Sequence, residues 1–340
     1  MRVFCLCSFV WFLVLLNQKT STCKGDEETS QCPSIYPDPS DTKLLLSKDF
    51  FVKYVNQSVY LADIIKAEDY GPIEDLLPEL REMYERADVF SDFDDQALIV
   101  KTKDTKMCFA SFQATDQANY FAFAVDLWHN INPLTERIEG TDCIIRRGVV
   151  QAYNTTYKKE FRRSLDDCIA SCGSDEPCPL VLTGASIGGA VAVAAAVDLT
   201  SLYDPTVITF SAPKVVVRTA PCEHLNSSKF FRFVNTDSQG NYDLIVNQLN
   251  LFNERHLGWT FLLDDVNFPL GSPGINDSRD RCPGSFALHE YNIYRGRVEG
   301  IINRDCFPLP IAGWPEGHYC RYDDECQTNY CNKRQCQRGL

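Results

Sequence analysis

A serine set between two glycines is the most chemically informative feature of this sequence. Residues 184–188 read Gly-Ala-Ser-Ile-Gly, after a short apolar run and before a stretch of small residues. A serine at a sharp strand-to-helix turn needs glycines on both sides, because side chains there would collide with the strand and the helix. The spacing therefore predicts a nucleophile elbow, with Ser186 as the nucleophile and Gly184 and Gly188 as the close-contact positions.

A serine hydroxyl becomes a nucleophile only when a histidine takes its proton and a carboxylate orients that histidine. In α/β-hydrolases these partners follow the serine in the order acid, then histidine. The histidines downstream of Ser186 are His224, His256, His289 and His318. One of these four is expected to be the general base.

The elements that would hold the elbow alternate between strands and helices. An apolar run at 180–183 is typical of a strand buried on both faces, and the small residues of 191–199 suit a helix packed closely on a sheet. Apolar runs at 207–210 and 230–234 supply the next two strands. Strand, turn, helix and strand form a βαβ unit, which predicts a mostly parallel sheet.

Upstream of the elbow, the pattern predicts a hairpin and several helices. Residues 96–102 and 107–112 are strand-like runs separated by a polar turn. Apolar positions between residues 60 and 86 recur at helical spacing on either side of Gly71-Pro72, which predicts two helices. Residues 149–169 predict one long amphipathic helix.

Several motifs in this order resemble a known family. They are 181–190 (VLTGASIGGA), 209–215 (TFSAPKV), 231–235 (FRFVN), His256-Leu257-Gly258 and 288–291 (LHEY). Together they look like successive motifs of the class 3 lipases, the fungal-type, Rhizomucor-like family. The resemblance extends from about Gln96 to Tyr294. It implies an α/β-hydrolase fold with a mostly parallel central sheet flanked by helices, and a serine ester hydrolase activity.

Carried over by position, the resemblance implies Ser186 as nucleophile and His289 as general base. The family's acid follows the Phe-Arg strand, where this chain has both Asp237 and Asp243. Asp243-Leu244-Ile245 resembles the family's Asp-x-Val and has the more suitable spacing to His256. Asp243 is therefore the expected acid, and Asp237 is the alternative, a loop carboxylate that caps its own turn. His256 is expected to be structural, with a reserve role as base.

The resemblance also implies an oxyanion hole formed by the backbone N–H of Ile187 and by Thr115. The sequence departs from the family nearby, because Ala185 replaces the histidine before the nucleophile and Gln113-Ala114 replaces Arg-Gly. The family's arginine side chain is therefore missing here as an anchor for the Thr115 loop.

The apolar segment 120–128 follows this loop, where related lipases carry a lid or the helix beneath it. Phe121, Phe123 and Trp128 are the candidates for lid side chains that face lipid. A helix packed in the core is an equally supported interpretation of this segment.

Composition excludes several other classes of protein. The 340 residues are 44% hydrophobic and 23% charged, as in a globular protein, and the net charge of −13 provides no basic surface for nucleic acid. The glycines of the elbow lack the lysine of a phosphate-binding loop. Cysteine and histidine spacings are irregular, so the sequence predicts neither a metal site nor a cofactor.

The N-terminus predicts export. Arg2, an apolar run at 4–16 and the small residues Thr20-Ser21-Thr22 have the pattern of a signal peptide over 1–22. Because the run is shorter than the roughly 20 residues that span a bilayer, we expect a cleaved leader, a secreted protein and no transmembrane segment; a signal anchor is the lesser alternative. Candidate N-glycosylation sites begin at Asn56, Asn154, Asn226 and Asn276.

The 16 cysteines are typical of an oxidising compartment, and cleavage of the leader leaves an even number. We expect a disulfide-tethered arm at 23–39, a hydrolase domain at 40–304 and a cysteine-rich tail at 305–340. The tail has few apolar residues and must be cross-linked to become ordered. The expected tail disulfides are two among Cys320, Cys326, Cys331 and Cys336, with Cys306 bonded to Cys282. The sequence names no partner for the tail.

The expected function is a secreted triacylglycerol lipase that acts at a lipid–water interface through an acyl-enzyme. A phospholipase and a non-lipid carboxylesterase are the alternatives among enzymes. A catalytically silent lipid- or partner-binding protein on a lipase scaffold is the alternative outside the enzymes.

Overall fold

The computed structural model describes most of the expected hydrolase domain. The described residues are 46–65, 73–92, 95–113, 134–154, 160–173, 177–217, 220, 222, 225, 229–237, 242–243, 254–264, 271–273, 284–303, 331–332 and 335–336. The expected signal peptide at 1–22 and the expected arm at 23–39 lie outside these ranges, so both stay predictions.

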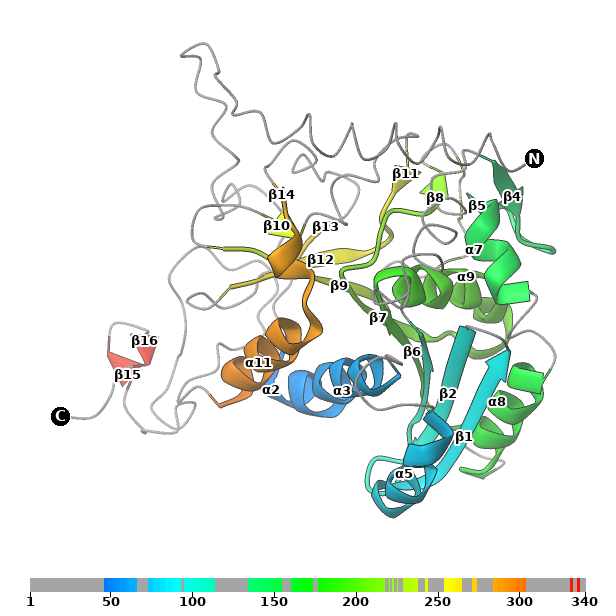
Figure 1. Ribbon diagram of the computed structural model, residues 1–340, viewed down its shortest axis with the longest axis horizontal. Coiled ribbons are helices and arrows are strands. Elements are labelled where there is room, and N and C mark those ends of the chain that lie inside the picture. Colours follow the sequence, from blue (N-terminus) through cyan, green and yellow to red (C-terminus); the bar gives the residue numbers. More distant parts are fainter. Residues whose placement is uncertain are drawn as a thin grey trace, which may run out of the picture.

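An eight-stranded sheet forms the centre of the protein, in the order β1-β2-β3-β6-β7-β9-β12-β13 (Figure 1). Its strands are β1 (Tyr84–Asp92), β2 (Asp95–Thr102), β3 (Cys108–Phe112), β6 (Leu180–Ala185), β7 (Thr206–Phe210), β9 (Phe230–Asn235), β12 (Trp259–Leu263) and β13 (Gly271–Pro273). The five strands β3, β6, β7, β9 and β12 pair in parallel, and antiparallel pairing is confined to the two edges. The mostly parallel sheet is therefore confirmed.

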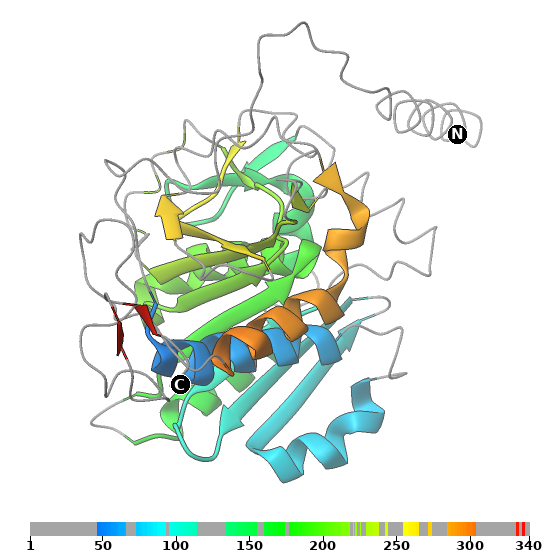
Figure 2. The ribbon, with the colours of Figure 1, turned by 90° about the vertical axis from the view of Figure 1, so that its left-hand side faces the viewer.

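Helices cover both faces of this sheet (Figure 2). On one face lie α2 (Lys48–Phe50), the π-helical turn Phe51–Val55, α3 (Asn56–Ile64) and α11 (Tyr291–Ile302). On the other face lie α7 (Arg147–Ala152), α8 (Glu160–Ala170) and α9 (Ser186–Tyr203). This three-layer arrangement is the expected one for parallel strands, whose two faces must both be shielded from water.

The alternation of side chains along the strands separates two hydrophobic cores. In β2, Ala97 and Ile99 belong to the core on the α9 side, whereas Leu98 and Val100 belong to the core on the α3 side. This alternation follows from the two-residue period of a strand. All four side chains are completely buried.

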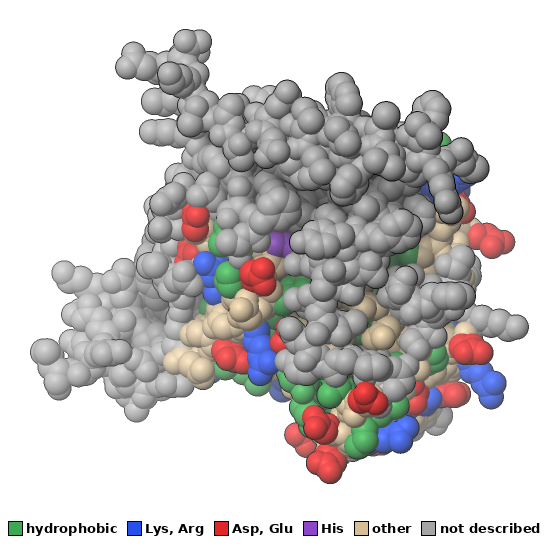
Figure 3. All heavy atoms as spheres, viewed as in Figure 1, with side chains coloured by type: hydrophobic (Ala, Val, Ile, Leu, Met, Phe, Trp, Pro, Cys, Tyr) green, Lys and Arg blue, Asp and Glu red, His purple; other side chains and the backbone are tan. Residues whose placement is uncertain are grey.

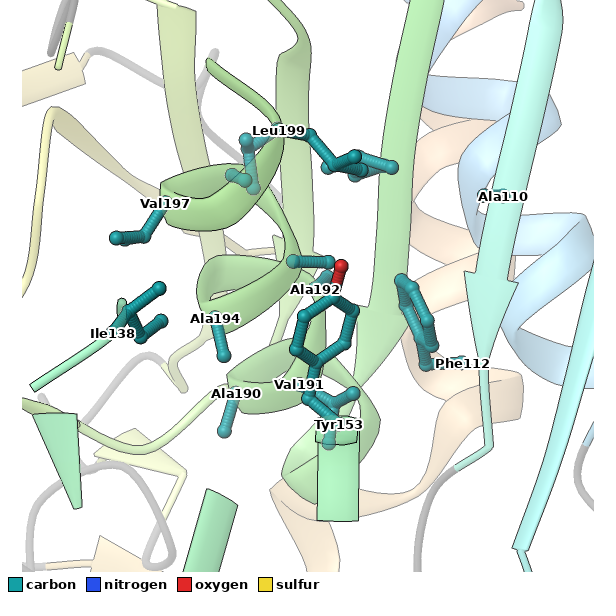
Figure 4. Packing of buried hydrophobic residues seen from close by; sticks show 14 of the residues in the cluster. Ala110, Phe112, Ile138, Tyr153, Ala190, Val191, Ala192, Ala194, Val197 and Leu199 are labelled. Atoms are coloured by element: carbon teal, nitrogen blue, oxygen red, sulfur yellow. The ribbon is translucent and has the colours of Figure 1, made fainter. Parts of the chain in front are cut away.

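Helix α9 packs closely against the sheet because its residues are small. Ala190, Ala192 and Ala194 lie in a core that also contains Tyr153 of the segment after α7 and Phe112 of β3 (Figure 4). Of the described helices, α9 alone is long and apolar enough to cross a membrane, but 61% of its apolar window is buried inside the protein. Such burial is typical of a core helix.

The structure differs from the expected elements in two places. The second of the two helices expected between residues 60 and 86 ends three residues early, since α5 covers Leu77–Met83. Tyr84 begins strand β1, which the sequence pattern did not predict. The long helix expected over 149–169 is described as two helices, α7 and α8, with residues 155–159 outside the described part. The hairpin is confirmed as β2 and β3.

A second, four-stranded sheet and three disulfides complete the described fold. The sheet has the order β11-β8-β5-β4 and consists of β4 (Thr135–Arg137), β5 (Ile144–Arg146), β8 (Val216–Val217) and β11 (Glu254–Arg255). The disulfides are Cys108–Cys168, Cys143–Cys222 and Cys172–Cys178. They confirm that cysteines of this chain form disulfides.

The tail is described at two short strands only. β15 (Cys331–Asn332) pairs with β16 (Gln335–Cys336), with Cys331 opposite Cys336. The other cysteines of the expected tail pairing, Cys282, Cys306, Cys320 and Cys326, lie outside the described residues. The expected pairing of the tail stays a prediction.

Acidic and basic side chains lie close together on the face seen in Figure 3. In the described structure, Arg295 of α11 forms ion pairs with Asp63 at 3.4 Å and with Glu299 at 3.0 Å. Because such exposed pairs contribute about 0–1 kcal/mol each, the cores and disulfides dominate the stability of the fold.

Candidate active site

Ser186 occupies the turn between β6 and α9. Its backbone φ is +50°, a conformation that residues other than glycine rarely adopt. Its side chain is buried. A Cβ at Gly184 would lie 2.4 Å from the carbonyl carbon of Gly188, and a Cβ at Gly188 would lie 2.1 Å from the carbonyl oxygen of Phe112. Both positions therefore exclude a side chain, as a nucleophile elbow requires.

Two short strands bring the acid and the histidine together. β10 (Tyr242–Asp243) pairs in parallel with β14 (Gly284–Ser285), and Asp243 lies opposite Ser285. A single 3₁₀ turn, Phe286–His289, follows β14 and ends at the histidine. The chain segments of the two expected partners are thus joined by backbone pairing.

The three side chains form a continuous hydrogen-bonded chain. His289 Nε2 lies 3.2 Å from Ser186 Oγ, and His289 Nδ1 lies 2.9 Å from each carboxylate oxygen of Asp243. Asp243 is completely buried and His289 nearly so. The carboxylate beside His289 is therefore Asp243, and this arrangement can move a proton from the serine to the imidazole while the carboxylate balances the charge.

Two further side chains contact the same carboxylate, and neither was foreseen as a site residue. Ser211, just after β7, donates a hydrogen bond from its hydroxyl to Asp243 Oδ2, and its Oγ lies 2.6 Å from His289 Nδ1. The hydroxyl of Tyr294 in α11 donates to Asp243 Oδ2 at 2.9 Å. The sequence could have pointed to Ser211, because it directly follows the predicted strand at 207–210, and binding sites of α/β sheets form at the carboxyl ends of parallel strands.

Tyr294 is a permanent donor to the carboxylate. Burial and the neighbouring charge of Asp243 both raise the pKa of the Tyr294 phenol well above its ordinary value. The phenol therefore stays protonated over the whole range in which a neutral histidine could act as a base. Its oxygen also accepts a hydrogen bond from the backbone N–H of Asn235, at 2.9 Å.

Asn235, at the end of β9, connects the main sheet to the 3₁₀ turn that contains His289. The Asn235 side-chain amide donates to the carbonyl of Leu288 at 2.8 Å. Arg297 of α11 donates to the Asn235 side-chain oxygen at 3.0 Å and to the Leu263 carbonyl at 2.8 Å. Because all these groups are buried, the bonds hold the turn before His289 with little competition from water.

His256, the reserve base, is buried beside a small cavity. It lines this cavity together with Thr209, Ala212 and Arg232, and the cavity lining contains none of the three residues of the hydrogen-bonded chain. Asp237, the alternative acid, is half-buried two residues after β9, and its backbone carbonyl accepts a hydrogen bond from Thr236.

The expected oxyanion donors are described in part. Ile187 is in the first turn of α9, where backbone N–H groups have no carbonyl partner within the helix. Thr115 and the lid candidates Phe121, Phe123 and Trp128 lie outside the described residues. The last described residue before them, Gln113, is buried against the elbow, because a Cβ at Gly188 would lie 2.6 Å from its carbonyl oxygen.

Among the candidate glycosylation sites, Asn154 is exposed and Asn56 is the half-buried first residue of α3. Asn226 and Asn276 lie outside the described residues. Within the described part of the chain, no three His, Cys, Asp or Glu side chains are grouped so that they could hold a metal ion.

Comparisons with known proteins agree with this fold. The family model "Lipase (class 3)" matches residues 109–238, which include the elbow and Ser211. A comparison with curated proteins finds no match.

Similar solved structures are fungal lipases. The Rhizomucor miehei lipase propeptide complex has a TM-score of 0.56 and 16% identity, with 79% of this chain and 94% of that chain covered. The lipase of Rhizopus microsporus var. chinensis has a TM-score of 0.55 and 16% identity, covering 77% and 92% of the two chains. The Rhizomucor miehei triacylglyceride lipase has a TM-score of 0.55 and 15% identity, covering 76% and 99%. These likenesses confirm the α/β-hydrolase fold.

Proposed function

We propose that this protein, an ester hydrolase of the class 3 lipase family, is a secreted triacylglycerol lipase with Ser186, Asp243 and His289 as its catalytic triad. One observation carries the proposal: the chain of hydrogen bonds from Asp243 through both ring nitrogens of His289 to Ser186, with distances of 2.9 and 3.2 Å. The match of the family model to the segment around Ser186 supports it.

In the acylation step, Ser186 Oγ attacks the ester carbonyl carbon while its proton passes to His289 Nε2. Asp243 accepts the hydrogen bond from His289 Nδ1–H, which keeps Nε2 free as the base and stabilises the imidazolium that forms. The negative charge on the former carbonyl oxygen is stabilised by the N–H of Ile187 and by Thr115. The C–O bond to the alcohol then breaks, and the alcohol leaves with the proton from His289.

In the deacylation step, water takes the place of the alcohol. His289 accepts a proton from the water as its oxygen attacks the acyl carbon bound to Ser186. The second tetrahedral intermediate releases the fatty acid, and Ser186 regains its proton from His289. No cofactor takes part in this mechanism.

The substrate and the location are parts of the same proposal. A triacylglyceride lipase has the same fold, which supports an acylglycerol substrate at a lipid–water interface. Three disulfides and the export signal expected at 1–22 support secretion. Phe121, Phe123 and Trp128 are proposed to face lipid as part of a lid.

Replacement of Ser186 tests the proposed nucleophile. Ser186→Ala is expected to abolish both ester hydrolysis and covalent labelling by a fluorophosphonate, because the acyl group and the phosphonyl group would both bond to the Ser186 hydroxyl. Ser201→Ala is the matched control, since Ser201 is exposed near the end of the same helix, α9. Wild-type turnover in the Ser186→Ala protein would refute the triad, and an unlabelled, inactive wild type would support a silent binding protein instead.

A substrate panel tests the lipid class. Emulsified triacylglycerol, phospholipid vesicles and a short soluble ester are compared with the wild-type protein and Ser186→Ala. A triacylglycerol lipase is expected to hydrolyse the emulsion faster than the same lipid below its solubility limit. Preference for the vesicles would assign a phospholipase, and activity on the soluble ester alone would assign a non-lipid carboxylesterase.

A further inference from the structure

We propose that Ser211 is a positioning residue, whose hydroxyl holds the Asp243 carboxylate and the His289 ring in the pose needed for proton transfer. This inference rests on the proposed triad and adds a fourth group to it. Ser211 comes from a different part of the fold than either partner, because it follows β7 whereas Asp243 is in β10 and His289 ends a turn after β14.

The contacts of Ser211 place it at the junction between the two partners. Its Oγ is 2.6 Å from His289 Nδ1 and also donates to Asp243 Oδ2, and its side chain is completely buried. A hydroxyl has one proton and two lone pairs, so it can donate to the carboxylate and accept from the ring N–H at the same time. The Ser211 hydroxyl therefore closes a triangle with the two catalytic partners.

The direction of the Ser211 proton matters for catalysis. If the hydroxyl donated to His289 Nδ1, the ring would carry its own proton on Nε2 and could not accept one from Ser186. When the Ser211 hydroxyl instead donates to Asp243 Oδ2, Nδ1 keeps its hydrogen and Nε2 stays a base. Tyr294 donates to the same carboxylate oxygen at 2.9 Å, so two hydroxyl groups from different elements, Ser211 after β7 and Tyr294 in α11, hold the Asp243 side chain in place.

The backbone conformation at Ser211 allows two variants to separate the effect of the hydroxyl from the effect of backbone strain. Its φ is +57°, in the left-handed region where glycine is the residue with the least strain. Ser211→Gly would relieve this strain and remove only the hydroxymethyl group. Ser211→Ala would remove the hydroxyl but keep the strained backbone with a Cβ.

This pair of variants separates the hydroxyl from the backbone. We expect Ser211→Gly and Ser211→Ala to lose kcat on a soluble ester by about 10-fold or more each, from the usual strength of a hydrogen bond to a charged group. KM is expected to change little, because Ser211 contacts the partners of the nucleophile rather than the substrate. The glycine variant is expected to melt at a higher temperature than the alanine variant.

A spectroscopic readout tests the positioning role directly. The His289 Nδ1–H proton is expected to give a downfield ¹H NMR signal that is absent in Asp243→Asn and shifted in both Ser211 variants. A merely structural role would change the melting temperature without moving this signal.

The possible outcomes distinguish this inference from the triad itself. Wild-type kcat in Ser211→Gly, or a loss in Ser211→Ala alone, would overturn the positioning role, provided that Ser186→Ala is inactive in the same assay. Full activity of Ser186→Ala would overturn the triad instead. Equal kcat losses in the two Ser211 variants, despite their different melting temperatures, would support the inference.

Discussion

At the scale of single residues, the two candidate acids, Asp243 and Asp237, have different surroundings. Asp243 is completely buried and receives hydrogen bonds from Ser211 and Tyr294 beside His289. A buried carboxylate needs such donors, because water no longer solvates its charge. Asp237 is half-buried after β9, where a loop carboxylate keeps part of its hydration.

The exchange of each carboxylate for an amide tests this difference. Asp243→Asn is expected to lower kcat by about 10⁴-fold, because the amide favours the tautomer of His289 with its proton on Nε2. Asp237→Asn is expected to leave kcat close to the wild-type value. Both are measured with a soluble ester, and circular dichroism checks that the variants are folded. A large loss in Asp237→Asn with little change in Asp243→Asn would transfer the role of the acid.

At the scale of elements, the elbow depends on the close approach of α9 to the end of β3. A Cβ at Gly188 would lie 2.1 Å from the carbonyl oxygen of Phe112 and 2.6 Å from that of Gln113. Both neighbours are backbone atoms, so they cannot rotate away as a flexible side chain would. The first turn of α9 therefore stays in contact with Phe112 and Gln113 only while position 188 is a glycine.

Gly188→Ala is expected to destabilise the protein by about 3 kcal/mol and to abolish ester hydrolysis, because the added methyl group separates β3 from α9. Gly300→Ala in α11 is the control: nothing lies within 4 Å of a Cβ at this exposed position, and the substitution should stabilise the helix by about 0.5–1 kcal/mol. Denaturant unfolding and hydrolysis of a soluble ester measure the two effects. An active, stable Gly188→Ala protein would show that the elbow tolerates a looser contact.

At the scale of the whole molecule, the disulfides connect segments that are far apart in the sequence. Cys108 at the start of β3 is bonded to Cys168 in α8, with a sequence separation of 60. Cys172 and Cys178 close a loop with a separation of only 6. In the chain-entropy model, the longer loop restricts the unfolded chain more strongly.

The two bonds are therefore expected to differ in their contribution to stability. Replacement of Cys108 and Cys168 by alanine should lower the free energy of unfolding by roughly 4 kcal/mol, and replacement of Cys172 and Cys178 by roughly 2 kcal/mol. Denaturant unfolding of both double variants under non-reducing conditions measures the difference. Equal losses would indicate that strain or residual structure in the unfolded chain outweighs loop length.

Local patterns in the sequence were sufficient to predict the elbow and the class of fold. The glycines around Ser186, the apolar strand before it and the small residues after it are neighbours in the chain, so their spacing directly reports the turn they form. The strands at 207–210 and 230–234 were predictable for the same reason, since continuous apolar runs suit strands with both faces covered. Strand β1 was not predictable from its own residues, because they include many polar side chains and form a strand by pairing with β2.

The sequence already favoured Asp243 over Asp237, but the contact of Asp243 with His289 and the contacts of Ser211 and Tyr294 with that carboxylate are visible only in the tertiary structure. From the sequence alone, the amino-acid types and the order of a serine, two candidate aspartates and a final histidine were evident. The structure joins Ser186 to a histidine 103 residues away and that histidine to a carboxylate 46 residues away. Contacts over such separations arise from strand order and from the β10–β14 pairing, which no local pattern encodes.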